Sequence, residues 1–386
     1  MAALAHLSMT CLAQGLTLGA DTFERRQALG IEAPSMARCG EFDLHQACGL
    51  LSADIVRRAL RSTGVDAEFR LFIHDDHTDL ESGLMRMREL YLNGHQTPPK
   101  DLPNSLWQAA ASRIWTMHGA RFVTRSTIAD WRPVFEQALL LEWRRQVDWA
   151  LERLAIEVSG WDSDAAVLRE AELFRSFENT LAAQQRLRAS DAGSVEVLGA
   201  GVWYEWRSSR GEPTAFARDI VYQAIKLGRE PKPWKNFWPA STGAYVDAVA
   251  DVLKSCGQAV ARLSWPLRLA ERDDLSREQP FSVAETVDVL AILRDESRSS
   301  ARLSLLRLAT GDSMSEALSW AHGRLALFRR WRMPDLAMPS SRKQCEAFLS
   351  SETPLEFLLS MVNAPDDRAS FLTNMRFIKD VLGVAV

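Results

Sequence analysis

The chain has 386 residues, a formal net charge of −4 and 47% hydrophobic residues. This composition is ordinary for a globular protein, and the length allows one big domain or two smaller ones. The negative charge argues against broad nonspecific binding to nucleic acid, and we expect no DNA partner. No apolar run reaches the roughly 18 to 20 residues of a membrane span, so we expect no membrane partner.

The five cysteines are odd in number, and no two of them form a C-x-x-C pair. This pattern disfavours both a disulfide framework and a zinc site made of thiolates. Reduced cysteines are typical of the cytoplasm, which is the location we expect.

The first part of the chain predicts a helix within residues 1–38 and then a loop over residues 31–37, which contains Pro34. Residues 50–61 carry apolar side chains at helical spacing and predict an amphipathic helix with Arg57, Arg58 and Arg61 outside. Gly64 suits the left-handed position after that helix, and residues 65–73 alternate as a strand. A helix, a turn and a buried strand are typical of a βαβ unit, whose ligands bind at the carboxyl ends of its strands.

The remainder of the chain predicts mostly helices. Residues 119–123 predict a turn into a second strand, and residues 194–207 predict a hairpin with Gly199 and Gly201 at its turn. Residues 229–239 predict a loop rich in proline and tryptophan. The predicted helices cover residues 81–92, 104–118, 133–157, 165–188, 214–227, 245–263, 282–294, 301–308 and 315–331, and a last pair reaches the C-terminus.

An acidic cluster follows the predicted strand. Asp75, Asp76 and Asp79 form the pattern D-D-x-x-D, with His74 before it and His77 within it. On a helix these carboxylates would lie within one turn and could hold Mg²⁺, which prefers oxygen ligands. The pattern resembles the metal motif of class I terpene synthases, which implies an all-helical fold and a Mg-dependent enzyme as one hypothesis. The second metal motif of that family has no match around Asp219, because the Ser and Glu are missing at the required spacing.

A second resemblance covers more of the chain. Asp54–Ala59 reads D-x-V-R-R-A, and the acidic motif ends the next strand. Trp265-Pro266-Leu267-Arg268 and the loop Met338–Lys343 follow in the same order. These pieces together resemble class I aminoacyl-tRNA synthetases, most closely the class I lysyl-tRNA synthetase family. The resemblance implies a Rossmann-like nucleotide-binding core of the HUP type with extensive helical insertions.

The resemblance also implies boundaries and roles. We expect a helical extension at 1–38, core halves at 39–150 and 264–386, and a mostly helical insertion with one hairpin at 151–263. It implies ATP and Mg as cofactors, an amino acid or small carboxylate as substrate, and tRNA as a further partner. The implied site residues are His45, Gln46, Arg342 and Lys343 for phosphate and catalysis, Asp75, Asp76, Asp79 and Trp265 for the substrate, and Asp43, Ser340 and Ser341 for ATP.

One signature loop departs from that family. Where its members have H-I-G-H, this chain has Asp43-Leu44-His45-Gln46, with one imidazole and no glycine. Imidazole N–H groups and a close backbone stabilise phosphate charge in such loops, so the departure weakens the site. We therefore expect a paralogue that activates or transfers an amino acid, rather than a housekeeping tRNA ligase. A non-catalytic protein that binds a nucleotide or tRNA is a further alternative.

Overall fold

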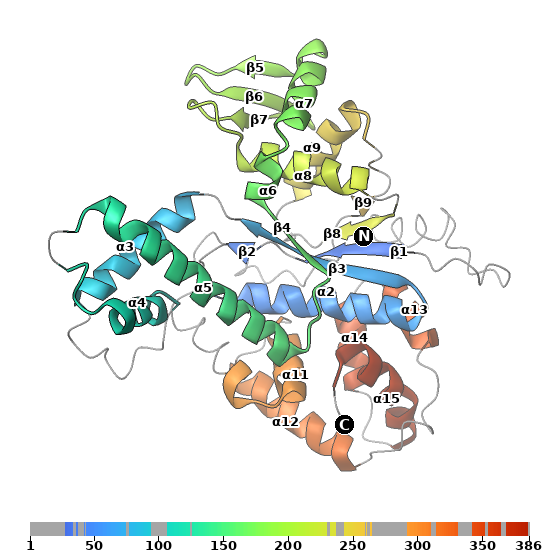
Figure 1. Cartoon of the computed structure of the whole chain (residues 1–386). Helices are drawn as coiled ribbons and strands as arrows, with labels where there is room; N and C mark the ends of the chain where they lie inside the picture. Colours follow the sequence, from blue (N-terminus) through green and yellow to red (C-terminus); the bar gives the residue numbers. More distant parts are fainter. Residues whose placement is uncertain are drawn as a thin grey trace.

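The computed structural model of the chain combines a parallel sheet with many helices (Figure 1). It describes residues 28–33, 36–37, 42, 44–74, 77–93, 106–123, 126–229, 232–236, 243–258, 260, 263–264, 292–309, 314–330, 342–351, 354–363 and 368–384. Among these residues, no helix combines the length and apolar character that crossing a membrane requires.

The central sheet is parallel throughout. Its strands are β1 (Ala28–Glu32), β2 (Met36–Ala37), β3 (Asp66–His74), β4 (Gly160–Ser163), β8 (Trp234–Asn236) and β9 (Leu263–Ser264). β1 and β4 pair with opposite edges of β3, and β2 continues along the β1 edge. The order across the sheet is therefore β4-β3-β1-β8-β9. If the short β2 is left out and the other five strands are numbered along the chain, this order is third, second, first, fourth, fifth. The direction of winding therefore reverses between β1 and β8.

One face of the sheet is covered by α2 (Leu44–Ser62) and α5 (Ile128–Leu154) (Figure 1). The apolar residues Ala67, Phe69 and Leu71 of β3 point to this face and join the larger hydrophobic core. Behind α2 pack α11 (Arg298–Ala309), α13 (Arg342–Ser350) and α15 (Arg368–Leu382), with α12 (Met314–Arg330) and α14 (Pro354–Val362) beside them. α3 (His77–Asn93) and α4 (Leu106–His118) pack with α5 into a helical lobe.

The other face of the sheet carries a second, smaller core. Phe72 and Trp234 point to it from β3 and β8, and they pack with apolar residues of α8 (Ala215–Arg229) and α9 (Gly243–Ser255). A three-stranded antiparallel sheet completes this lobe, made of β5 (Leu187–Ala189), β6 (Val195–Gly199) and β7 (Val202–Arg207). The short α6 (Asp164–Leu168) and α7 (Ala171–Ala183) connect β4 to it.

The structure confirms several sequence predictions. The helix over residues 50–61 is part of α2, the strand over 65–73 is β3, and Gly64 between them has φ +93°. The hairpin over 194–207 is β6 and β7, with Gly199 and Gly201 at its turn. The parallel sheet also shows that the all-helical alternative for the fold is wrong.

Other predictions about local structure are wrong. The single helix predicted over 165–188 is divided into α6 and α7, and its end overlaps β5. The range 31–37, expected as a loop, contains the end of β1 and the whole of β2, because the short run Leu29–Ile31 is buried between β3 and β8. Residues 119–123, expected as a strand, form a turn whose Phe122 packs in the core beside Tyr91. The segment 229–239, expected as a loop, contains β8.

Arg57, expected outside α2, is buried together with Asp54. The Asp54 carboxylate accepts hydrogen bonds from Arg57 at 2.6 Å, from Arg58 at 2.7 Å and from Arg302 of α11 at 2.7 Å. Arg302 also donates to the carbonyl oxygens of Leu154 and Leu382. The D-x-V-R-R pattern therefore joins α2 to α5, α11 and the end of α15.

Candidate functional site

A cluster of polar side chains lies on the α8 face of the sheet, near the carboxyl ends of its strands. In a parallel sheet, paired residues point to the same face, and side chains alternate along each strand. Arg70 pairs with Glu32, and Glu32 pairs with Asn236, so these three side chains form one row across β3, β1 and β8. Asp162 of β4 pairs with Phe72 and stands in the next row toward the carboxyl edge.

Lys226 of α8 lies over this row and is fully buried. Its Nζ donates to Glu32 and, at 2.7 Å, to Oδ1 of Asn236. Burial lowers the pKa of Lys226, although the charge of Glu32 acts in the opposite direction. Asn236 in turn donates to Oε1 of Gln223 at 3.3 Å. The Nε2 of Gln223 is buried and makes no hydrogen bond with any residue that the structure describes, so it is a donor without an acceptor there.

Arg70 and Asp162 form the second part of the cluster. The guanidinium of Arg70 donates twice to Asp162, at 2.8 and 3.0 Å, in a bidentate pair. Gly160 makes room for it, because a Cβ there would lie 2.6 Å from the guanidinium. The hydroxyl of Tyr222 donates to the same carboxylate at 3.0 Å. These contacts hold α8 against β3 and β4.

His74, the last residue of β3, faces an acid of α6. Its Nδ1 lies 3.1 Å from Oδ2 of Asp164, and the guanidinium of Arg218 lies 2.9 Å from Oδ1 of the same carboxylate. Burial disfavours a charged imidazole, but the hydrogen bond and charge of Asp164 outweigh it and raise the pKa of His74. The end of β3 is therefore the place where a protonated histidine is stabilised.

Asp219 of α8 differs from the other acids of the cluster. It accepts a hydrogen bond of 2.5 Å from the hydroxyl of Tyr245, and no cation of the described residues forms an ion pair with it. Burial raises the pKa of Asp219 to about 6, because a neutral phenol compensates its charge only in part. This carboxylate is the group in the cluster best suited to receive a cation from outside.

The residues implied by the motifs are less fully described. His45 and Gln46 lie in the first turn of α2, Asp79 lies in the first turn of α3, and the side chains of His45 and Asp79 fall outside the description. Arg342 and Lys343 are exposed at the start of α13, where Arg342 donates to Glu346 at 2.9 Å. The structural description does not include Asp43, Asp75, Asp76, Trp265, Ser340 and Ser341. The roles of all these residues stay predictions.

The two ends of the acidic motif are nevertheless placed. β3 ends at His74 and α3 begins at His77, so the acids follow a strand, as the second resemblance requires. Within the described part of the chain, no three His, Cys, Asp or Glu side chains are grouped so that they could hold a metal ion.

The polar face of α8 was not predicted from the sequence. Asp219, Tyr222, Gln223 and Lys226 are three or four residues apart, so they share one side of the helix. Polar residues at this spacing on a helix that is otherwise apolar were the available signal. Glu32 gave none, because it closes a strand that the sequence did not predict.

The whole chain is similar in structure to solved synthetases. A Campylobacter jejuni protein designated an arginyl-tRNA synthetase matches with a TM-score of 0.65 and 14% identity, over 99% of this chain and 98% of that one. This chain has a class I aminoacyl-tRNA synthetase-like fold. The arginyl-tRNA synthetases of Plasmodium falciparum and Thermus thermophilus match with TM-scores of 0.57 and 0.53 and identities of 11% and 13%. They are covered over 76% and 85% of their lengths, by 94% and 98% of this chain.

No protein-family model and no curated protein sequence matches the chain. The likeness to synthetases that the motifs suggested is confirmed at the level of the fold. The closer likeness to lysyl enzymes is not supported, because the structural neighbours carry arginyl names.

Proposed function

We propose that this chain is a synthetase-like paralogue that binds an amino acid and ATP at the carboxyl edge of the parallel sheet. The observation that carries the proposal is the strand order, third-second-first-fourth-fifth, which is typical of Rossmann-like nucleotide-binding sheets. Such sheets bind ligands where the winding reverses. Here that point lies between β1 and β8, where Glu32, Lys226 and Asn236 meet.

We propose that the amino acid has a cationic side chain, and arginine is the first candidate. Among the described residues no cation forms an ion pair with Asp219, and the pKa of this carboxyl is raised, so a guanidinium beside it would be stabilised by charge and by hydrogen bonds. The unpaired Nε2 of Gln223 would serve a polar oxygen of the same ligand. The names of the structural neighbours agree with this choice.

ATP would bring the phosphoanhydride that activates a carboxylate. The topology places the N-terminus of α2 after β2, at the edge where a phosphate would benefit from the helix dipole and its free N–H groups. His45 and Gln46 lie in that first turn and are the proposed phosphate contacts, with Arg342 and Lys343 as cations for pyrophosphate. Asp75, Asp76 and Asp79 are the proposed groups for the substrate amine or for Mg²⁺.

The test is amino-acid-dependent exchange of pyrophosphate into ATP, with arginine first and then the full set of amino acids. Exchange with arginine that is lost in Asp219→Asn and retained in Asp247→Asn would support the proposal. Asp247 is an exposed acid on α9 and serves as the matched control. Absence of exchange with every amino acid would count against adenylate formation.

A non-catalytic binding protein is the second candidate. The observation that favours it is the loop Asp43–Gln46, which has one imidazole where the family has two. This alternative predicts no exchange, but a rise of the melting temperature with arginine, ATP or tRNA, since a ligand stabilises the state that binds it. The predicted cytoplasmic location is part of both proposals.

A further inference from the structure

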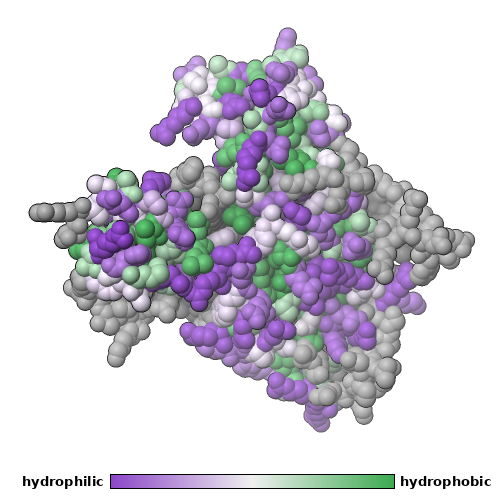
Figure 2. Space-filling model, in the orientation of Figure 1, coloured by the Kyte–Doolittle hydropathy of each residue, from purple (hydrophilic) through white to green (hydrophobic). Residues whose placement is uncertain are grey.

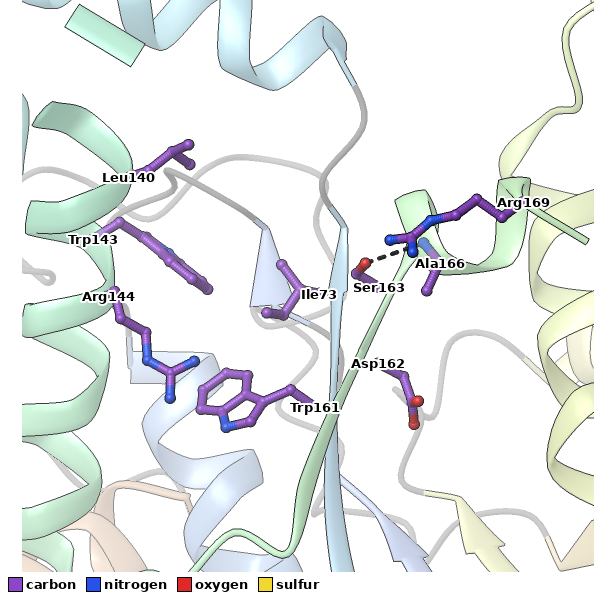
Figure 3. Close-up of a pocket in the computed structure, with 9 residues that line it drawn as sticks. All are labelled: Ile73, Leu140, Trp143, Arg144, Trp161, Asp162, Ser163, Ala166 and Arg169. Atoms are coloured by element: carbon purple, nitrogen blue, oxygen red, sulfur yellow. Dashed lines mark hydrogen bonds between the residues drawn. The ribbon is translucent and has the colours of Figure 1, made fainter. Parts of the chain in front are cut away.

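A separate pocket lies on the opposite side of β4. It is open to solvent, has a volume of about 430 Å³, and is lined by residues of α5, β3, β4 and α6 (Figure 3). This volume is in the range of sites for small ligands, roughly 300 to 1,000 Å³. In the space-filling view the described surface is indented between the helical lobe and the lobe that contains α8, α9 and the antiparallel sheet (Figure 2).

The pocket and the polar cluster use alternate residues of the same strand. Asp162 points to the α8 face, where Arg70 and Tyr222 bind its carboxylate. Trp161 and Ser163, its neighbours in β4, point to the α5 face and into the pocket (Figure 3). The pocket therefore lies on the other face of β4 from the polar cluster, and Asp162 borders both.

Two indole rings form the apolar walls. Trp143 of α5 is almost completely buried, and Trp161 of β4 is partly exposed, with Ile73 between them (Figure 3). The guanidinium of Arg144 lies over the Trp161 ring, 4.1 Å from its centroid. Flat aromatic and guanidinium surfaces are the usual partners of stacked nucleobases.

A cation stands at the rim of the pocket. Arg169 is exposed, and its Nε donates to the carbonyl oxygen of Ala165 at 3.2 Å, which leaves the terminal nitrogens available for an anion. No carboxylate forms an ion pair with Arg169 among the described residues. The charge of Asp162, the acid in the lining, is compensated by its bidentate pair with Arg70.

We propose that this pocket binds a nucleotide, with the base against Trp161 and the phosphate at Arg169. The ligand is either a free mononucleotide or the terminal nucleotide of a single-stranded RNA. The two sources share the same chemistry, a planar base and a phosphate. An apolar ligand would make no ion pair with Arg169, and a simple anion would make no stacking contact with the two indoles.

The test uses the full chain and 2-aminopurine, a fluorescent base whose emission falls when it stacks. The probes are 2-aminopurine riboside, its 5′-monophosphate, and a single-stranded trinucleotide that ends in this base. The variants are Trp161→Leu and Arg169→Gln. The matched controls are Trp203→Leu, whose indole lies under Arg188 at 4.0 Å outside the pocket, and Arg175→Gln, an exposed arginine that likewise donates to the carbonyl four residues earlier.

We expect saturable quenching of the monophosphate by the wild-type chain. Trp161→Leu weakens binding about tenfold or more, the scale of one lost stacking interaction. Arg169→Gln weakens binding of the monophosphate but leaves the riboside unchanged, and the two controls bind as the wild type does. Tighter binding of the trinucleotide than of the monophosphate identifies RNA as the source, and equal binding identifies a free nucleotide.

Two results would overturn the proposal. The first is equal affinity of the wild type and Trp161→Leu for the monophosphate, including no binding by either. The second is loss of binding in Asp219→Asn with retention in Trp161→Leu, which would place the probe in the strand-end cluster instead. Circular dichroism and the melting temperature of each variant show whether the fold is intact, and Trp161→Phe, which keeps a ring, is expected to bind.

Discussion

Lys226 and Glu32, 194 residues apart in the chain, form a buried ion pair where the first and fourth strands of the parallel sheet lie side by side. Removing one member leaves the other charged and buried. Lys226→Met is therefore expected to lower the free energy of unfolding by about 3–5 kcal/mol. The double variant with Glu32→Gln loses less, since no charge is then left alone. Urea denaturation measures both.

The control for this experiment is an ion pair in partial contact with water. Arg376 and Asp380 are four residues apart on α15. Arg376→Met is expected to change the free energy of unfolding by at most about 1 kcal/mol. A loss in Lys226→Met no larger than this would contradict a buried, interacting pair.

The three arginines around Asp54 make the second prediction. Burial alone would raise the pKa of this carboxyl group, but the charges of Arg302, Arg58 and Arg57 outweigh it and lower the pKa below the usual value. A lowered acid pKa stabilises the fold above the unfolded pKa of about 3.9, and this stability is lost as the pH falls through the folded value. Asp54→Asn removes the charge and is expected to destabilise the chain by about 3–5 kcal/mol at pH 7.

The measurement is the free energy of unfolding of the wild type and Asp54→Asn from pH 7 to pH 3. The difference between them is expected to shrink only toward the acid end of this range. A constant difference over the whole range would show that the charge of Asp54 does not stabilise the fold.

The third prediction concerns pH and the binding of arginine. Burial raises the pKa of Asp219 to about 6, so this carboxyl is protonated below that pH and cannot pair with a guanidinium. Affinity for arginine is therefore expected to rise as the pH increases from 5 to 7.5. The stability of the chain without arginine depends on pH in the opposite direction. A raised acid pKa stabilises the folded state at low pH, and this contribution is lost as the pH rises through about 6.

Isothermal titration at several pH values tests the affinity. His74, Glu32 and Asp164 also influence Asp219, and the pKa of His74 is raised, so the wild type is compared with His74→Gln. If the affinity for arginine still rises with pH in His74→Gln, the rise is caused by deprotonation of Asp219. A flat affinity from pH 5 to 7.5 would contradict a role for this carboxylate.

The fourth prediction uses two glycines in different surroundings. A Cβ at position 160 would lie 2.6 Å from the Arg70 guanidinium, whereas a Cβ at Gly228 on α8 meets no atom within 4 Å. Gly160→Ala is expected to destabilise the chain by about 1–3 kcal/mol through crowding. Gly228→Ala is expected to stabilise it by about 0.5–1 kcal/mol, since alanine is the better helix former. Thermal melts of both variants measure these changes, and a melting temperature of Gly160→Ala equal to that of the wild type would contradict close packing of Arg70 against position 160.

The sequence predicted the elements whose pattern is long and regular. α2 and β3 could be predicted because their apolar residues repeat over enough positions, and Gly64 marks the turn between them. β1 and β8 are too short for a pattern to show, and each has a proline beside it, Pro34 and Pro233. Residues 119–123 are apolar enough for a strand, but Phe122 is buried in a turn instead.

The roles predicted for the motif residues stay predictions, and only the position of polar residues at the end of β3 can be compared with the structure. The strand end at His74 was expected to carry polar groups, and it does. The ion pair between Lys226 and Glu32 could not be predicted, because it depends on the order of strands that local patterns do not reveal. The same holds for Asp219, whose pKa is raised by burial and, to a smaller extent, by the charges of Glu32 on β1 and Asp164 on α6.

Equilibrium binding of labelled arginine to the wild type, Asp219→Asn and Asp247→Asn shows whether the Asp219 carboxylate binds the amino acid. We expect saturable binding of one arginine per chain at pH 7.5, lost in Asp219→Asn and unchanged in Asp247→Asn. Equal binding by the wild type and Asp219→Asn, or no binding of arginine by the folded wild type, would contradict this expectation.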